Sequence, residues 1–219
     1  MHMTRTVAAL YVDPRGHYFG RPDVDPWDEA RDARRYSGSA PVVAHPPCDL
    51  WVNLAAVNWK RYGRQLPAWY PGGDDRGCFA AALAAVRRWG GVLEHPGGTH
   101  AWAHHGLPRP PDAGWQRTFE GEWVCEVRQA AYGHRARKRT WLFYVGERPP
   151  FELNWDKAEG THQCGFVFGK DGKRPYVGKR EARATPLAFA EVLIQLARGA
   201  RQATGADATS LAGLDLHSL

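Results

Sequence analysis

Short apolar runs that stop abruptly at polar or proline-containing turns constrain the fold of this chain most strongly. Three runs of strand length end at Asp13, at Cys48 and at Glu94. Helical patterns lie between them, at residues 26–36 and 77–89. Strands that alternate with helices predict an α/β fold, with a single Rossmann-like, mostly parallel sheet and helices on both faces.

The rest of the chain extends this pattern. Further strands are predicted at residues 123–127 and 140–145, and an amphipathic helix at residues 186–198. An Asp-Gly turn between two apolar segments predicts a small β-hairpin insertion at about residues 160–182.

Composition sets the class of protein. The chain has 219 residues, 43% of them hydrophobic, which suffices for one core. We expect a single compact domain over residues 1–198 and a flexible tail over residues 199–219. Without an apolar run of membrane-spanning length or a signal-peptide pattern, a cytoplasmic protein with no membrane partner is expected. The widely spaced cysteines favour reduced thiols and no metal site.

Positive charge is concentrated in two segments of the chain, which carries a formal net charge of +6. The segments are residues 135–139 and 170–183, and the aromatic residues Tyr132, Trp141 and Tyr176 flank them. Basic and aromatic residues together hold phosphates and stack bases, so DNA is the expected partner. Within these segments, the predicted DNA contacts are Arg135, Lys138, Lys173 and Arg174.

The chemically active residues follow the predicted strands. In open α/β sheets, ligands bind beyond the carboxyl ends of the strands. Pro46 and Pro47 fix the backbone before Cys48 and remove two N–H donors. A rigidly presented thiol near the Glu94 carboxylate suits nucleophilic catalysis, with His45, Pro47 and His95 lining the substrate site. The alternative is an ordinary Pro-Pro turn followed by a small buried cysteine.

Four segments, taken in order, resemble the DNA cytosine-5 methyltransferase family. His45-Pro46-Pro47-Cys48 matches the family's strand ending in Pro-Pro-Cys, and Glu94-His95-Pro96 matches its Glu-Asn-Val. Residues 135–139 match a Gln-x-Arg-x-Arg segment at the start of a strand, and residues 184–190 match an Asn-x-Val-Pro helix start. In this chain Arg135 replaces the family's Gln, and His95 replaces its Asn.

The resemblance implies covalent chemistry on a flipped-out pyrimidine. Cys48 would be the nucleophile that adds to C6 of cytosine, and Glu94 the acid that engages the ring. Arg137 and Arg139 would position the base and the carboxylate, and one of them would lower the pKa of Cys48.

The resemblance also implies a cofactor. The donor would be S-adenosylmethionine or another one-carbon donor, bound near the loop that follows the first strand. The candidate residues for this site are Asp13, Gly16, Phe19 and Asp25.

Two other functions stay open. A catalytically inactive relative would bind nucleic acid through its basic segments alone. An enzyme acting on a free pyrimidine nucleotide would need no target-recognition domain, for which residues 146–184 are too short.

Overall fold

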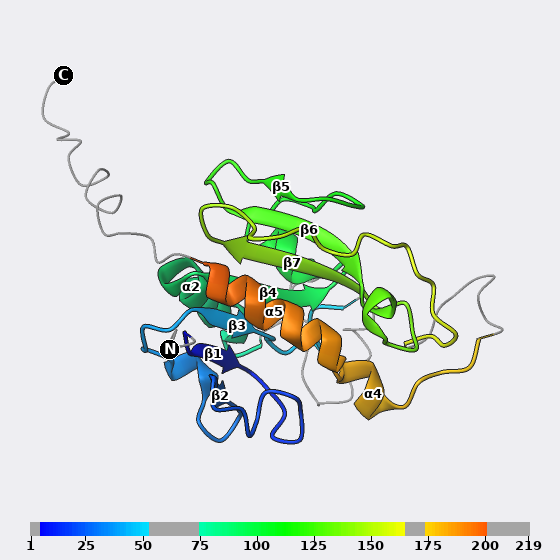
Figure 1. Cartoon of the computed structure of the whole chain (residues 1–219), viewed down its shortest axis with the longest axis horizontal. Coiled ribbons are helices and arrows are strands. Elements are labelled where there is room, and N and C mark those ends of the chain that lie inside the picture. Colours follow the sequence, from blue (N-terminus) through cyan, green and yellow to red (C-terminus); the bar gives the residue numbers. More distant parts are fainter. Residues whose placement is uncertain (1–4, 53–74, 165–173, 201–219) are drawn as a thin grey trace, which may run out of the picture.

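The computed structural model describes residues 5–52, 75–164 and 174–200. They form a seven-stranded mixed sheet with the order β2-β1-β3-β4-β7-β6-β5 (Figure 1). The strands are β1 (Val7–Leu10), β2 (Val24–Trp27), β3 (Val42–Ala44), β4 (Gly91–Pro96), β5 (Gln116–Arg117), β6 (Trp123–Arg128) and β7 (Arg139–Val145). The helices are α2 (Cys78–Trp89), α3 (His100–His104), α4 (Lys179–Arg183) and α5 (Leu187–Gly199), with 3-10 turns η1 (Ala33–Arg35) and η2 (Gln129–Tyr132).

The sheet has two halves that differ in the relative direction of their strands. Strands β2, β1, β3 and β4 run parallel to one another, whereas β7, β6 and β5 continue the sheet with antiparallel pairing. The predicted parallel character therefore holds only for the first half. The short connection at residues 129–138 contains no crossover helix, so the chain returns from β6 to β7 in the antiparallel direction.

Alternation along the strands divides the core into two clusters, one on each face. Val7 and Ala9 of β1 belong to the cluster that contains the buried side of α5. Ala8 and Leu10 belong to the cluster that contains the buried side of α2. Helices therefore cover both faces of the sheet, as predicted (Figure 1).

Helix α2 and strand β4 meet at a pair of glycines. Gly90 closes α2, and its N–H donates to the Val86 carbonyl. Gly91 begins β4 with a φ of 122°, and a Cβ there would lie 2.0 Å from the carbonyl oxygen of Val42. Only glycine allows β4 to start this close to β3.

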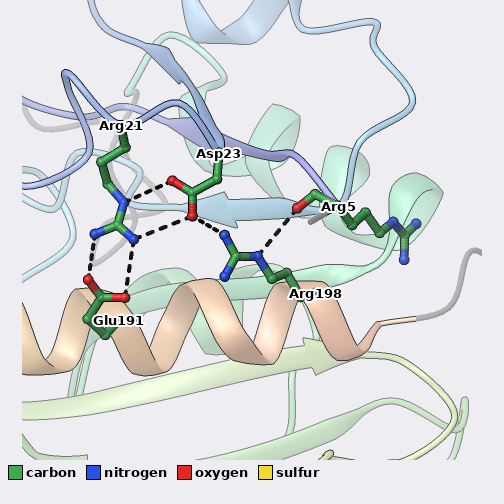
Figure 2. Close-up of polar contacts among 5 residues, drawn as sticks. All are labelled: Arg5, Arg21, Asp23, Glu191 and Arg198. Carbon is green, nitrogen blue, oxygen red and sulfur yellow. Dashed lines mark hydrogen bonds and ion pairs between the residues drawn. The ribbon is translucent and has the colours of Figure 1, made fainter. Parts of the chain in front are cut away.

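Ion pairs fix α5 to the opposite end of the chain (Figure 2). Arg21 donates to both oxygens of Glu191 on α5, at 2.5 and 3.2 Å. The Asp23 carboxylate accepts from Arg21 and from Arg198 at the end of α5. Arg198 also donates to the Arg5 carbonyl at 3.3 Å, so the segments that precede β1 and β2 are both bound to one helix.

The predicted helix at residues 26–36 is wrong. Strand β2 occupies Val24–Trp27 and pairs in parallel with β1 at the edge of the sheet, and η1 is a single turn. Proline is tolerated in an edge strand, so Pro26 marks the edge rather than a helix start. Asp25 accepts from the Trp27 indole and pairs with Arg31.

The other predicted strands and helices are confirmed, with ends that shift by a residue or two. The predicted hairpin falls mostly on residues 165–173, outside the described residues, and Gln163 and Tyr176 beside it form an isolated parallel bridge. Of the predicted tail, Gly199 still belongs to α5 and residues 201–219 are outside the described part. Within the described residues, no helix is long and apolar enough to cross a membrane.

Candidate active site

The carboxyl ends of the parallel strands bring the candidate residues to one edge of the sheet. Strands β1, β3 and β4 are parallel neighbours, as predicted for the strands before Asp13, Cys48 and Glu94. The register pairs Ala44 with Leu93, so His45 and Glu94 come next at the same level. The His45 N–H donates to the Leu10 carbonyl at 3.0 Å, which extends the pairing into the loop.

Glu94 is the centre of a buried hydrogen-bond network on the α5 face. Its Oε2 lies 3.1 Å from His45 Nδ1, and its Oε1 accepts from Gln129 Nε2 at 3.0 Å. Gln129 also donates to Thr140 Oγ1 on β7, and the Tyr18 hydroxyl lies 2.8 Å from His45 Nε2. The network thus runs from the loop after β1 to the antiparallel half of the sheet, and each carboxylate oxygen of Glu94 has a hydrogen-bond partner.

The Glu94 carboxylate is ionised in this arrangement. Burial alone would raise its pKa, but the hydrogen bond and charge of His45, with smaller contributions from Lys138 and His95, lower the pKa to about 2. Burial raises the pKa of Tyr18 well above its usual value, so this phenol keeps its proton. The Tyr18 hydroxyl and the Glu94 carboxylate therefore contact the two ring nitrogens of His45.

The loop that carries Cys48 is anchored by Trp51. The Trp51 N–H donates to the Cys48 carbonyl at 2.9 Å and closes a turn. The Trp51 side chain is 2% exposed, and its indole donates to Asp75 at 2.9 Å. The Trp51 carbonyl accepts from the His100 N–H at 2.8 Å. These contacts present Cys48 on a rigid segment, as expected from the two prolines before it.

The Cys48 thiol is protonated near neutral pH. Burial raises its pKa to about 11, and the negative charges of Asp49 and Glu94 act in the same direction. Arg183 and Lys138 lower the pKa but do not offset these effects. The expected lowering by Arg137 or Arg139 is therefore wrong for this state, because the cations that act on the thiol come from other positions.

Helix α4 and the segment before β7 lie against the Cys48 loop. Arg183 at the end of α4 donates to both oxygens of Asp49, at 2.8 and 2.7 Å. Lys138 Nζ donates to the Ala184 carbonyl at 2.6 Å. Lys138 has a φ of 39°, an unusual backbone conformation for a lysine, and its charge acts on both Cys48 and Glu94.

Arg137 and Arg139 lie apart from this site. Arg139 pairs with both oxygens of Glu126, at 2.7 and 2.6 Å. By alternation along β7 it shares the α2 face with Trp141, whereas Glu94 faces α5. Arg137 pairs with Glu159 at 3.3 Å. The structure brings together Cys48 and Glu94 but places these two arginines in a separate pocket.

Of the candidate cofactor residues, Asp13, Gly16 and Phe19 follow the carboxyl end of β1, whereas Asp25 lies within β2, in register with Ala8. Asp13 is paired with Arg15, at 3.1 Å, and its carbonyl accepts from the Gly16 N–H at 2.8 Å. Asp25 is paired with Arg31, and Phe19 packs against the α5-side core. Both carboxylates have arginine partners and Phe19 packs against the core, and binding of S-adenosylmethionine at these residues stays a prediction.

The residues predicted to contact substrate or DNA divide between the site and the surface. His45 and Lys138 belong to the site, and Pro47 is exposed beside Cys48. His95 is fully buried on the α2 face, with Nδ1 2.8 Å from Thr99 Oγ1, and burial lowers its pKa to about 4. Two predicted DNA contacts are elsewhere: Arg135 pairs with Glu181, and Arg174 donates to Glu159. The third, Lys173, is outside the described residues.

Five residues of the site were not predicted from the sequence. Asp49 could have been found from its position directly after Cys48. Gln129, a polar residue at the end of an apolar strand, gave a weaker signal. Arg183 ends the basic segment 170–183 but was not assigned to the site. No local pattern marks Tyr18 or Thr140, whose partners lie on distant segments.

Comparison with protein-family models, with curated proteins and with solved structures gives no match to this chain. Among the described residues, no cluster of histidine, cysteine, aspartate and glutamate side chains could hold a metal ion.

Proposed function

We propose that this protein modifies a pyrimidine base, with cytosine in DNA as the substrate, through a covalent adduct at Cys48. One observation carries the proposal. A thiol and a buried, hydrogen-bonded carboxylate occupy adjacent carboxyl ends of parallel strands, close enough for the charge of Glu94 to raise the pKa of Cys48. This is the edge at which open α/β sheets bind ligands.

The resting protonation states suggest how the pair acts. Cys48 holds a proton and Glu94 does not. A bound base that takes the place of the His45 hydrogen bond would raise the pKa of Glu94, which brings the two groups closer in basicity. Glu94 would then take the thiol proton and pass it to N3 of the ring, while the Cys48 sulfur bonds to C6.

The adduct needs no second substrate in order to form or to reverse. Addition at C6 leaves an enamine that takes up a proton from solvent at C5. Loss of a C5 proton, followed by departure of the Cys48 sulfur, restores the pyrimidine. A full transfer reaction requires in addition an electrophilic one-carbon donor, which by the resemblance is S-adenosylmethionine.

Exchange of the C5 hydrogen with solvent tests this proposal directly. Cytosine-containing single-stranded DNA is incubated with the protein in D₂O, and deuterium in the recovered nucleoside is measured by mass spectrometry. We expect exchange with the unaltered protein and none with Cys48→Ser, because a hydroxyl stays protonated near neutral pH. Cys78→Ser, a partly buried cysteine on α2, is the matched control and should exchange normally.

Equal exchange by Cys48→Ser and the unaltered protein would overturn the covalent mechanism. Exchange of free dCMP but not of DNA would identify a nucleotide enzyme. A catalytically inactive nucleic-acid-binding protein is the second candidate, and the raised pKa of Cys48 favours it. Salt-dependent DNA binding without any exchange would support that candidate.

A further inference from the structure

A charged pocket of about 280 Å³ lies among β6, β7 and the loops beside them. Five of its lining side chains are basic: Arg109, Arg128, Arg137, Arg139 and Lys157. Two are acidic, Asp112 and Glu126, which leaves an excess of three positive charges. This composition excludes an apolar ligand and favours a compact anion.

The acidic residues do not neutralise the pocket. Glu126 accepts two hydrogen bonds from Arg139 and one from the Trp141 indole, and among the described residues Arg139 is its ion-pair partner. Arg128 and Arg137 share a single carboxylate, Glu159, at the edge of the pocket.

Two of the basic side chains are available to a ligand. Across the described ranges, no ion pair or side-chain hydrogen bond engages the guanidinium of Arg109 or the ammonium of Lys157. Both side chains are exposed at the rim of the pocket, whereas Arg139 is fixed on β7. The pocket therefore combines a rigid guanidinium with two exposed cations, an arrangement suited to the oxygens of phosphate groups.

We infer that this pocket binds backbone phosphates of the nucleic-acid substrate. The inference rests on the proposed function in one respect, the choice of nucleic acid as the source of the phosphates. It assigns to Arg137 and Arg139 a contact with the substrate's backbone, on the face of the sheet that Glu94 does not occupy. Arg109, Arg128 and Lys157 join them as residues of the same site.

Binding measured with Cys48→Ser separates this inference from the base chemistry. Fluorescence anisotropy gives the affinity of the full chain for a labelled single-stranded DNA at several NaCl concentrations. Each phosphate contact contributes about 0.7 to the slope of log K against log salt for single strands. Arg109→Ala and Lys157→Ala, made in the Cys48→Ser background, should each lower the magnitude of the slope by about that amount, whatever the DNA sequence.

Arg35→Ala is the matched control, because Arg35 is an exposed arginine on η1 near the other edge of the sheet. Its slope should equal that of the parent protein. Unchanged slopes in both pocket variants would overturn the inference. Pyrophosphate binding is measured for the same variants. Loss of pyrophosphate binding in the two pocket variants, with unchanged DNA slopes, would also overturn the inference, because the pocket would then bind free phosphates and not the DNA backbone. Absence of C5 exchange, by contrast, would affect only the proposed function.

Discussion

Two buried glutamates on opposite faces of the same sheet have different partners. Glu94 is 8% exposed and Glu126 is 7% exposed. Glu126 on β6 faces α2 and is held by Arg139 and the Trp141 indole. Glu94 on β4 faces α5 and is held by His45 and Gln129. Burial would raise the pKa of each carboxyl, but the hydrogen bonds and charges around each lower it.

The difference distinguishes a structural carboxylate from a reactive one. Arginine keeps its charge at any pH that a folded protein tolerates, so Glu126 has a permanent counter-charge. Among the described residues, the hydrogen-bond partners of Glu94 are an imidazole and a neutral amide, so no guanidinium supplies it with a permanent counter-charge. The charge of Glu94 acts on the partly buried Cys48 thiol, whereas the charge of Glu126 acts on Cys125, which is fully buried. We therefore expect proton transfer at Glu94 and only structural consequences at Glu126.

Replacement of each glutamate by glutamine should produce the largest contrast. Glu94→Gln removes the proton carrier and should lower the rate of C5 exchange by roughly 100- to 10,000-fold. Glu126→Gln should leave that rate within a few-fold of the original, while costing roughly 1–3 kcal/mol of stability, because a charged hydrogen-bond partner is lost. Exchange in D₂O and urea unfolding measure the two effects. Equal rate losses would remove the distinction between the two sites.

The reactivity of Cys48 gives a second test of the difference between Glu94 and Glu126. Its pKa is raised from 9.0 to about 11, which gives a thiolate fraction at pH 7 roughly 100-fold below that of an ordinary cysteine. Alkylation by iodoacetamide, followed at the Cys48 peptide by mass spectrometry, should therefore be slow and should rise about tenfold per pH unit. Glu94→Gln should accelerate it by removing a negative charge, and Glu126→Gln should not. Fast alkylation at pH 7 would contradict the protonated state.

His95 should make the protein sensitive to mild acid. Its pKa is about 4 in the folded chain, against 6.5 for an ordinary histidine, so the unfolded chain binds the proton first. The neutral, buried His95 therefore contributes its full share to the free energy of unfolding above pH 6.5. That contribution, about 3 kcal/mol at most, is lost as the pH falls toward 4. Urea unfolding at several pH values should show a flatter profile for His95→Gln. His17→Gln, which alters an exposed histidine, should retain the original profile.

The smallest effect is expected at the end of the Glu94 network. Tyr18→Phe removes the hydroxyl that contacts His45 Nε2 and should cost about 1 kcal/mol of stability. It should also change the pH profile of C5 exchange, since His45 loses the partner that fixes its tautomer. A stability loss with an unchanged profile would limit Tyr18 to a packing role.

The sequence predicted the parallel half of the fold well. Apolar runs before Asp13, Cys48 and Glu94 have strand length and stop at clear turns, so their elements and their common edge could be inferred. Strand β2 was missed because Pro26, with acidic residues around it, also fits the first turn of a helix. Only the pairing with β1, a tertiary contact, decides between the two structures.

The side-chain directions in the antiparallel half could not be predicted. Grouping Arg139 with Glu94 requires both side chains to face the same side of the sheet. In the register of β4 and β7, Glu94 lies opposite Leu142, on the α5 face, and Arg139 falls on the other face. A shift of one residue would reverse this result, and the sequence alone does not fix the register of two strands so far apart.

The ion pairs between α5 and the start of the chain have a consequence for biosynthesis. The sheet face beneath α5 collects apolar side chains from β1, β3, β4, β6 and β7, and α5 comes after all of these strands in the chain. A nascent chain emerging from the ribosome therefore carries this face uncovered until residues 187–199 have been made. During that interval the apolar face is exposed to non-native association, and the ion pairs of Arg21 and Asp23 with Glu191 and Arg198 cannot yet form.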